Sequence, residues 1–489
     1  MAMEYEHGFI GRQRELDALQ AALARAVSGQ PGVVLLTGEP GIGKTRTAQE
    51  MVEHARQRAV LALWGRCPEE PGAPPYWPWL QLIRRYVALQ DEAVLGETLG
   101  TAARYVAALD PEQLGRLGLG RPVPLESDAA KARFRFFDAI ASFWRRAAAH
   151  QPILLVIDDL HRADVPSLRL LEFIMAEAQN SRLMLLGTYR DSEVVRQHPL
   201  SDTLAELHRH VPVLRFLLGG FTPAETVRFV NTVVPDTSAE LAMVLHEQTE
   251  GHPLFLTELT LDCNQSGAPG AQPAGLGMRA VPKGVRDVIG VRLNRVSPAC
   301  LRVLQHAAVF GREFRLDLLP RVLGDVNEDD CLAALDEARS ASLVEGLAEP
   351  GSYQFVHALV RDTLYDELPA VQRARWHQNI AQVLESACQG DLTRCLSALA
   401  HHYHAAGASG DVSKAIEYAT RAAERAAATQ AHEEASRHYL QACDLLPAGA
   451  TADAQRCSLL LGLGNAQNSA GASEQALTTF AHAAACARR

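Results

Sequence analysis

The sequence predicts an α/β core built on a five-stranded parallel sheet, followed by smaller and largely helical domains. Two observations support this fold class. Short apolar segments alternate with helix-like stretches over residues 1–218, which is typical of parallel strands buried on both faces. Beyond residue 390 the chain becomes a series of alanine-rich helical segments. The expected strands are Val33–Thr37, Leu61–Gly65, Ile153–Ile157, Leu183–Tyr189 and Val213–Leu217.

Composition and charge limit the classes of protein to consider. A chain of 489 residues, 47% of them apolar, can form the cores of about three or four domains. The formal charge of −10 provides no general attraction to nucleic acid or to anionic membranes. No apolar run is long enough to span a bilayer, and the N-terminus lacks the features of a secretion signal, so we expect a cytoplasmic protein with no membrane contact.

Cysteine usage agrees with a cytoplasmic location. The nine cysteines include no Cys-x-x-Cys pair, and the closest two, Cys388 and Cys395, are seven residues apart. We therefore expect packed, reduced thiols rather than disulfides or a zinc site.

The first expected strand leads into the sequence GEPGIGKT, which matches the pattern G-x-x-x-x-G-K-[ST] of a P-loop. Glycines let such a loop point its backbone amides at nucleotide phosphates, and the helix that follows favours an anion at its N-terminus. Lys44 would contact the β- and γ-phosphates, and Thr45 would ligate Mg²⁺. The pattern predicts that ATP or ADP binds with Mg²⁺. The expected contacts are Gly38, Glu39, Pro40, Gly41, Ile42, Gly43, Lys44, Thr45 and Arg46.

The third expected strand ends in two aspartates, the arrangement of a Walker B motif. We expect Asp158 to hold Mg²⁺ together with Thr45, and Asp159 to orient or deprotonate the attacking water. Capping of the next helix is the alternative role for both aspartates. The fourth strand ends near Thr188, which could hydrogen-bond that water, and Arg190, which either contacts the γ-phosphate or pairs with Asp191. The predicted catalytic residues are Lys44, Asp158, Asp159 and Arg190.

Further motifs follow along the chain in a definite order. Residues 9–16 are FIGRQREL, residues 65–67 are GRC, and residues 74–79 are PPYWPW. Residues 158–164 are DDLHRAD, and residues 251–256 are GHPLFL. Together they resemble the STAND ATPases, signal-transduction ATPases with numerous domains, and among these the large LuxR-type (LAL) transcriptional regulators. The resemblance covers nearly the whole chain, although that family usually has tryptophan at the position of Arg162.

The resemblance implies further nucleotide contacts. Ile10, Gly11 and Arg12 would wrap the adenine, and Pro253 would pack on it. His357 would contact the β-phosphate of ADP, although the family usually has aspartate after this histidine, where this chain has alanine. For Pro253 and His357 taken alone, a helix start and a cap or packed side chain are the simpler interpretations.

The chain divides at changes in composition. Thr222-Pro223-Ala224-Glu225 is a helix start with cap, N1 proline and N3 glutamate, and it would open a helical lid. A stretch rich in Gly, Pro, Ala and Gln follows as a linker, and strands at 343–346 and 353–356 would form the wing of a winged-helix domain. The predicted domains are residues 1–218 (ATPase core), 219–263 (lid), 264–280 (linker), 281–390 (winged helix) and 391–489 (tetratricopeptide-like repeats).

The last domain matches the tetratricopeptide pattern, for example at Gly464, Gly471, Ala476 and Phe480. Small residues let the two helices of a unit approach closely, and such arrays usually bind proteins. In this register the chain stops at position 33 of a 34-residue unit, without the polar capping helix that a solenoid needs. We therefore expect a truncated chain whose output domain, a LuxR-type DNA-binding helix-turn-helix, is missing.

The function predicted is an ATP/ADP switch with slow ATP hydrolysis. A protein or small-molecule inducer would bind the repeats, ATP would replace ADP, and the protein would self-associate and regulate transcription. One alternative is an AAA-type remodelling ATPase, with an arginine finger such as Arg145, Arg146 or Arg209. Another is a nucleotide-stabilised scaffold. DNA binding by the winged helix itself is not expected, because no basic cluster marks a recognition helix. The Pro-Tyr-Trp-Pro-Trp segment is expected to be rigid surface packing, with a ligand- or partner-contacting loop as the alternative.

Overall fold

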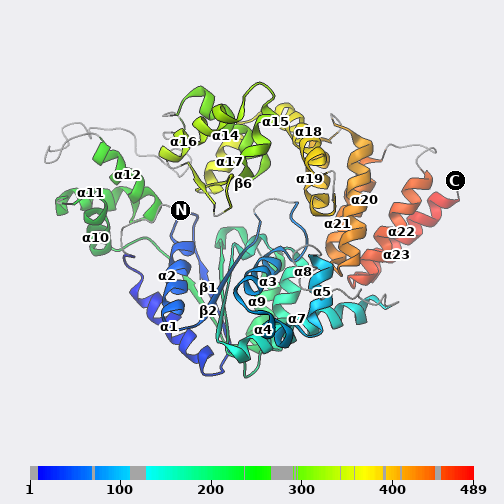
Figure 1. Cartoon of the computed structure of the whole chain (residues 1–489), viewed down its shortest axis with the longest axis horizontal. Helices are drawn as coiled ribbons and strands as arrows, with labels where there is room; N and C mark the ends of the chain where they lie inside the picture. The colour runs from blue at the N-terminus through cyan, green and yellow to red at the C-terminus, as the bar shows by residue number, and fades with distance from the viewer. Residues whose placement is uncertain are drawn as a thin grey trace.

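The computed structural model describes most of the chain. The described residues are 9–68, 72–110, 128–195, 197–235, 237–265, 290, 293, 296–341, 343–347, 349–356, 358–388, 392–407, 410–446 and 453–488. His357 and almost all of the expected linker 264–280 lie outside them. In Figure 1 the α/β core lies at the bottom, and the helical units form an arch above it. Within the described part of the chain, no helix has the length and apolar character that a membrane crossing requires.

The core contains the five expected strands in one parallel sheet, in the order β2-β3-β4-β1-β5. Their positions agree with the sequence prediction, and three of them are one residue longer. The strands are β1 (Gly32–Thr37), β2 (Leu61–Arg66), β3 (Ile153–Asp158), β4 (Leu183–Tyr189) and β5 (Val213–Leu217). Arg66 lies in register with Asp158, and Thr37 with Tyr189, so the strand ends that carry polar residues meet at one edge of the sheet.

Helices cover both faces of this sheet because successive strand residues point to opposite sides. Val33 and Leu35 belong to the apolar cluster on one face, and Val34 and Leu36 to the cluster on the other. Helices α1 (Gln13–Val27) and α2 (Lys44–Gln57) cover the second of these faces. The other face is covered by α3 (Trp77–Leu89), α4 (Glu92–Leu99), α5 (Ala102–Leu109), α7 (Ala129–His150), α8 (Val165–Ala176) and α9 (Pro199–His210).

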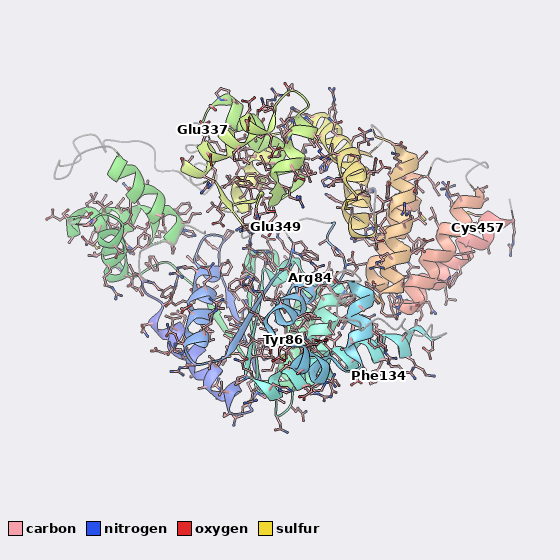
Figure 2. The ribbon with its side chains drawn as sticks, in the orientation of Figure 1. Arg84, Tyr86, Phe134, Glu337, Glu349 and Cys457 are labelled. Carbon is pink, nitrogen blue, oxygen red and sulfur yellow. A yellow bond between two sulfur atoms is a disulfide. The ribbon has the colours of Figure 1, made fainter. Side chains whose placement is uncertain are left out.

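The Pro-Tyr-Trp-Pro-Trp segment is part of the core, so the expectation of surface packing is wrong. Tyr76 and Trp79 are 0% and 1% exposed, and the Trp79 indole donates a hydrogen bond to the Ser167 carbonyl oxygen at 3.0 Å. The reason is the helical insertion between β2 and β3, whose aromatic side chains form a thick second layer. Figure 2 labels Tyr86 within this layer, where it packs edge-on against the rings of Phe143 and Trp144.

Two helical units follow the core. The first contains α10 (Pro223–Val233), α11 (Ala239–Thr249) and α12 (Pro253–Gln265), and its expected capping box between Thr222 and Glu225 is present. The second unit packs its helices around a small antiparallel sheet of order β6-β8-β7, and the two expected strands are β7 and β8. Its elements are α14 (Pro298–Phe310), β6 (Glu313–Arg315), α15 (Leu319–Leu323), α16 (Glu328–Ser340), β7 (Val344–Gly346), β8 (Ser352–Phe355), α17 (Ala358–Asp366) and α18 (Ala370–Ala387). Short 3-10 turns lie at Leu160–Arg162, Asp191–Glu193, Leu316–Leu318 and Leu392–Arg394.

The C-terminal part is a row of helices, as the repeat pattern predicts. A Cβ atom on Gly464 would lie 2.5 Å from the Phe480 ring, and one on Gly462 would lie 2.6 Å from Tyr439. Glycine is therefore needed where these helices approach each other, which is the role expected of small residues here. The helices are α19 (Leu396–Ala406), α20 (Val412–Ala428), α21 (His432–Leu445), α22 (Asp453–Ser469) and α23 (Ser473–Ala487).

One expectation about cysteines is wrong. Cys388 and Cys395 form a disulfide, with their Cα atoms 6.7 Å apart. The pairing arises because α18 and α19 are consecutive, packed helices, and their connection brings the two residues together. Cys67, Cys300, Cys331, Cys443 and Cys457 are not in a disulfide.

Candidate nucleotide site

The P-loop curls at the end of β1 and begins helix α2 at Lys44. Gly38 and Gly41 have φ angles of 140° and 81°, in the region that disfavours side chains. A Cβ atom on Gly38 would also lie 2.8 Å from the Leu218 carbonyl oxygen, so neither steric space nor conformation permits another residue. The loop and the helix N-terminus together form the geometry that binds phosphate groups.

Lys44 lies over this loop and is buried, with 7% of its surface exposed. Its ammonium group donates hydrogen bonds to the carbonyl oxygens of Gly38 and Glu39, at 2.9 and 2.8 Å. Burial lowers the pKa of Lys44 to about 8, although the nearby carboxylate of Asp159 opposes this shift. The side chain therefore remains charged at neutral pH in a desolvated position, which fits the binding of an anion.

Asp158, at the end of β3, is fully buried and accepts hydrogen bonds from three elements. The Thr45 hydroxyl lies 3.2 Å from both of its carboxylate oxygens. The Thr188 hydroxyl donates to one oxygen, and the Arg66 guanidinium donates to the other at 3.1 Å. Thr45 and Asp158 thus come together as expected and offer the hard oxygen ligands that Mg²⁺ prefers.

Asp159 follows in a left-handed conformation with φ 59°, which is uncommon for a residue with a side chain. Its amide donates to the Thr188 hydroxyl at 3.0 Å. Its carboxylate faces two cations, with Oδ2 3.7 Å from Arg66 Nε and 3.9 Å from Arg312 Nη1. The helix-capping alternative is wrong for Asp159, because the side chain that caps α8 belongs to Asp164.

The end of β4 differs from expectation in two details. Arg190 does not pair with Asp191; it binds Glu193 at 2.6 Å, whereas Asp191 pairs with Arg215. The hydrogen of the Thr188 hydroxyl is committed to Asp158, so this residue holds the two aspartates in place. His161 is buried beside Arg190, and burial together with this cation lowers the pKa of His161 to about 3.

The N-terminal motif and the first helical unit meet at the P-loop. Arg12 is buried, and its guanidinium donates to the carbonyl oxygens of Ile42, at 3.1 Å, and Gly219. Its amide donates to the carboxylate of Glu225, the residue that also completes the cap of α10. Ile10 and Gly11 precede Arg12 and are half-buried.

The start of α12 closes the other side of the loop. His252 Nε2 lies 3.1 Å from the Pro40 carbonyl oxygen. A Cβ atom on Gly41 would lie 2.8 Å from the Leu254 side chain, so the first helical unit packs directly on the P-loop. Pro253 opens α12 between these two contacts and is half-buried.

The site contains residues that were not predicted from the sequence. Arg66 could have been found, because it ends a strand beside β3 at the edge where the phosphate site forms. Arg312 precedes β6 in the second helical unit, and no local pattern links it to the nucleotide site. Glu225 was predicted only as part of a helix cap.

Comparison with known proteins agrees with this geometry. Residues 8–186 match the family described as the AAA ATPase domain. This stretch is similar to that family. The matched residues include the P-loop, Asp158 and Asp159.

Two further comparisons extend beyond residues 8–186. An uncharacterized protein of Rhizobium meliloti is 25% identical across 93% of this chain, which spans 44% of that protein. The crystal structure of a STAND protein with a tetratricopeptide repeat sensor from Pyrococcus horikoshii aligns with 99% of this chain, at a TM-score of 0.50 and 15% identity. The chain spans 65% of that structure. The fold, an α/β core followed by mostly helical units, is thus similar to that of a STAND ATPase.

Proposed function

We propose that the chain is an ATP/ADP-dependent signal-transduction switch with slow ATP hydrolysis. In this proposal ADP holds the AAA ATPase domain, the lid and the second helical unit together. An inducer that binds the helical repeats loosens this closed state, ATP replaces ADP, and the protein self-associates.

The observation that carries the proposal is the position of Arg312. This side chain comes from the second helical unit and is 12% exposed, yet its Nη1 lies 3.9 Å from the carboxylate of Asp159. Asp159 is the residue best placed to orient a water molecule, and here it faces Arg312 and Arg66 instead. An arginine from outside the ATPase domain therefore occupies the neighbourhood of the Walker B carboxylate, which favours a resting state with little hydrolysis.

The lid supports the same state from the opposite side. Arg12, Glu225 and His252 connect the N-terminal motif, α10, α12 and the P-loop through hydrogen bonds. A lid that contacts the loop directly would slow the release of a nucleotide bound there. We propose that Ile10, Gly11, Arg12 and Pro253 form the adenine-binding side of the site. The role of His357 at the ADP phosphate rests on the family resemblance.

The helical repeats also contact the ATPase domain, so a ligand there can influence the site. The Tyr76 hydroxyl donates to the Gln430 carbonyl oxygen at 3.2 Å, between α20 and α21. Arg133 on α7 pairs with Glu433 on α21 at 2.9 Å, and both side chains are largely buried. Displacing the repeats would break these contacts, and we propose that this is how a protein or small-molecule inducer opens the switch.

Within the site, each residue has a proposed role. Thr45 and Asp158 would hold Mg²⁺, and Lys44 and Arg190 would stabilise phosphate charge. Bound Mg²⁺ would neutralise part of the negative charge of the phosphates. Asp159 would orient water once Arg312 withdraws. Regulation of transcription through a separate LuxR-type DNA-binding domain is part of the proposal and rests on the family resemblance, as does the winged-helix assignment of residues 281–390.

The alternative of an AAA-type remodelling ATPase requires an arginine finger, and the three arginines considered for that role are already paired. Arg146 donates to the carbonyl oxygens of Thr98 and Leu99, and Arg145 pairs with Glu177, so both are used within their own chain. Arg209 is exposed but pairs with Glu206 on the same helix.

The nucleotide content of the purified protein tests the proposal. The protein is denatured, and the released nucleotide is quantified by ion-exchange chromatography. We expect close to one ADP per chain. An empty site that binds and hydrolyses ATP rapidly would overturn the switch and favour the remodelling ATPase.

A further inference from the structure

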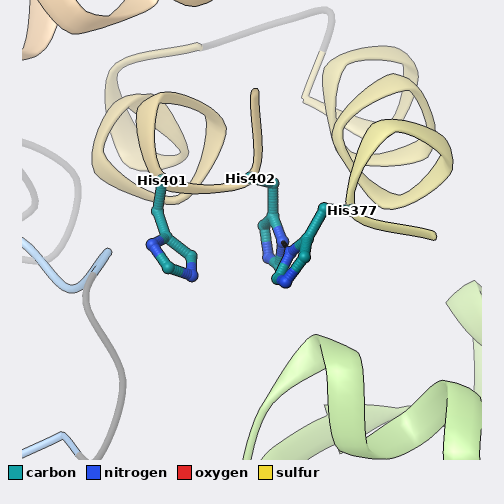
Figure 3. Close-up of side chains that lie close together, drawn as sticks. All are labelled: His377, His401 and His402. Carbon is teal, nitrogen blue, oxygen red and sulfur yellow. Dashed lines mark hydrogen bonds between the residues drawn. The ribbon is translucent and has the colours of Figure 1, made fainter. Parts of the chain in front are cut away.

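Three histidines converge where the second helical unit meets the repeats. His377 lies on α18, and His401 and His402 lie side by side on α19 (Figure 3). One ring nitrogen from each lies within 4.8 Å of the corresponding nitrogens of the other two. His377 and His402 are buried, and His401 is half-buried.

We propose that His377, His401 and His402 form a binding site for a divalent transition metal ion of the zinc class. Imidazole nitrogen is a preferred ligand of Zn²⁺, and three histidines with one open position form a known tetrahedral arrangement. The site is remote from the P-loop, and the inference does not depend on the proposed function.

The hydrogen bonds of His377 orient its ring as expected for a metal ligand. Its Nε2 lies 2.9 Å from the Tyr365 hydroxyl oxygen, and its Nδ1 lies 2.8 Å from His402 Nδ1. If Nε2–H donates to Tyr365, the lone pair of Nδ1 points toward the other two histidines. Such an outer partner is what usually orients a metal-binding histidine.

The three rings must shift to bind one ion, because their ligand nitrogens lie within 4.8 Å of one another. Two nitrogens bound to one tetrahedral zinc ion lie roughly 3.3 Å apart, given Zn–N distances of about 2.0–2.1 Å. Slight rotation of the His377 and His402 rings would increase the distance between their Nδ1 atoms from 2.8 Å to that value. The proton of His402 would then move to its other ring nitrogen. His401 contacts both rings, and in the described part of the chain its ring nitrogens make no hydrogen bond, so it is available as the third ligand.

The charges around the cluster limit how tightly it can bind an ion. Burial lowers the pKa of His377 to about 3 and that of His401 to about 4, with further lowering by Arg361, Arg373 and Arg437. The imidazoles are therefore neutral, as metal ligands must be. The same arginines repel a cation, so we expect weaker binding than at a four-ligand structural zinc site, with water or a small anion as fourth ligand.

The test uses the whole chain without an affinity tag, at neutral pH and free of chelator. Co²⁺ is titrated while the visible absorption of tetrahedral Co²⁺ is recorded, and Zn²⁺ is then added to displace it. We expect one equivalent of Co²⁺ to bind and one equivalent of Zn²⁺ to remove the signal. His377→Ala and His401→Gln should each lower the affinity by roughly a hundredfold or more.

His404→Ala is the matched control, because His404 lies on the same helix and is also half-buried but does not belong to the cluster. It should bind Co²⁺ like the unaltered protein. Because His377 is buried, the fold of each variant is checked by circular dichroism, and the half-buried His401 provides the second, milder substitution. Absence of Co²⁺ and Zn²⁺ uptake, or uptake that is the same in His401→Gln and the unaltered protein, would overturn the proposal and leave a hydrogen-bonded histidine cluster.

Discussion

Replacing Arg312 by alanine should weaken the closed state of the switch. At the observed 3.9 Å, the attraction between Arg312 and Asp159 is about 4 kcal/mol at an effective dielectric constant of about 20. Desolvation of both charges offsets much of this, and Asp159 keeps Arg66 at 3.7 Å as a partner. We therefore expect a net loss of about 1–2 kcal/mol, which corresponds to an opening equilibrium that is about 5–30 times more favourable.

The assay is the dissociation rate of a fluorescent ADP analogue chased with excess ADP. Arg312→Ala should release the analogue about 5–30 times faster than the unaltered protein. Arg315→Ala is the control, since Arg315 lies on neighbouring β6 but is exposed and pairs with Asp317. If both arginine variants release the analogue at the unaltered rate, the Arg312 contact does not hold the nucleotide site closed. The double variant Arg312→Ala/Asp159→Asn should release the analogue little faster than Arg312→Ala alone, because both substitutions remove the same contact.

Further predictions concern the P-loop and the Walker B residues. Lys44→Ala should abolish ATP binding while circular dichroism stays unchanged; unchanged ATP affinity would refute the P-loop assignment. Because a bound phosphate favours protonated Lys44, whose pKa is about 8, ADP affinity should fall as the pH rises through 8, by up to roughly tenfold per pH unit above it, as measured by calorimetry. Thr188→Ala leaves buried Asp158 one hydrogen bond short and should cost about 1–3 kcal/mol in urea denaturation, with Thr188→Ser restoring most of it. Gly41→Ala places a Cβ atom against Leu254 and should weaken ADP binding; normal affinity would show that lid packing at this point is dispensable.

The sequence was sufficient for the parts of the fold that depend on local patterns. The strands β4 and β5 have the predicted bounds, because buried parallel strands are short apolar runs between turns. Thr45 and Asp158 come together as expected, because the P-loop and the Walker B motif follow strands whose ends meet at one edge of the sheet.

Contacts that depend on long-range packing could not be predicted from a single sequence. Arg312 reaches Asp159 from the second helical unit, and only the packing of that unit on the core creates the pair. Tyr76 looked like a surface aromatic because nothing local shows that the α3–α7 insertion covers it. The disulfide of Cys388 and Cys395 likewise depends on how α18 packs on α19, which cysteine spacing does not reveal.

The end of β2 and the residue before α3 contact two different parts of the molecule. Arg66 binds the Walker B carboxylate, and Tyr76 binds the backbone beside α21. Thermodynamic linkage is reciprocal, so a molecule that lowers ADP affinity through the repeats must itself bind more weakly, by the same factor, when ADP is present. Removing the nucleotide should therefore strengthen capture of that molecule. Cell extracts would be screened in parallel against nucleotide-free and ADP-loaded protein. The inducer would be the component retained mainly by the nucleotide-free protein.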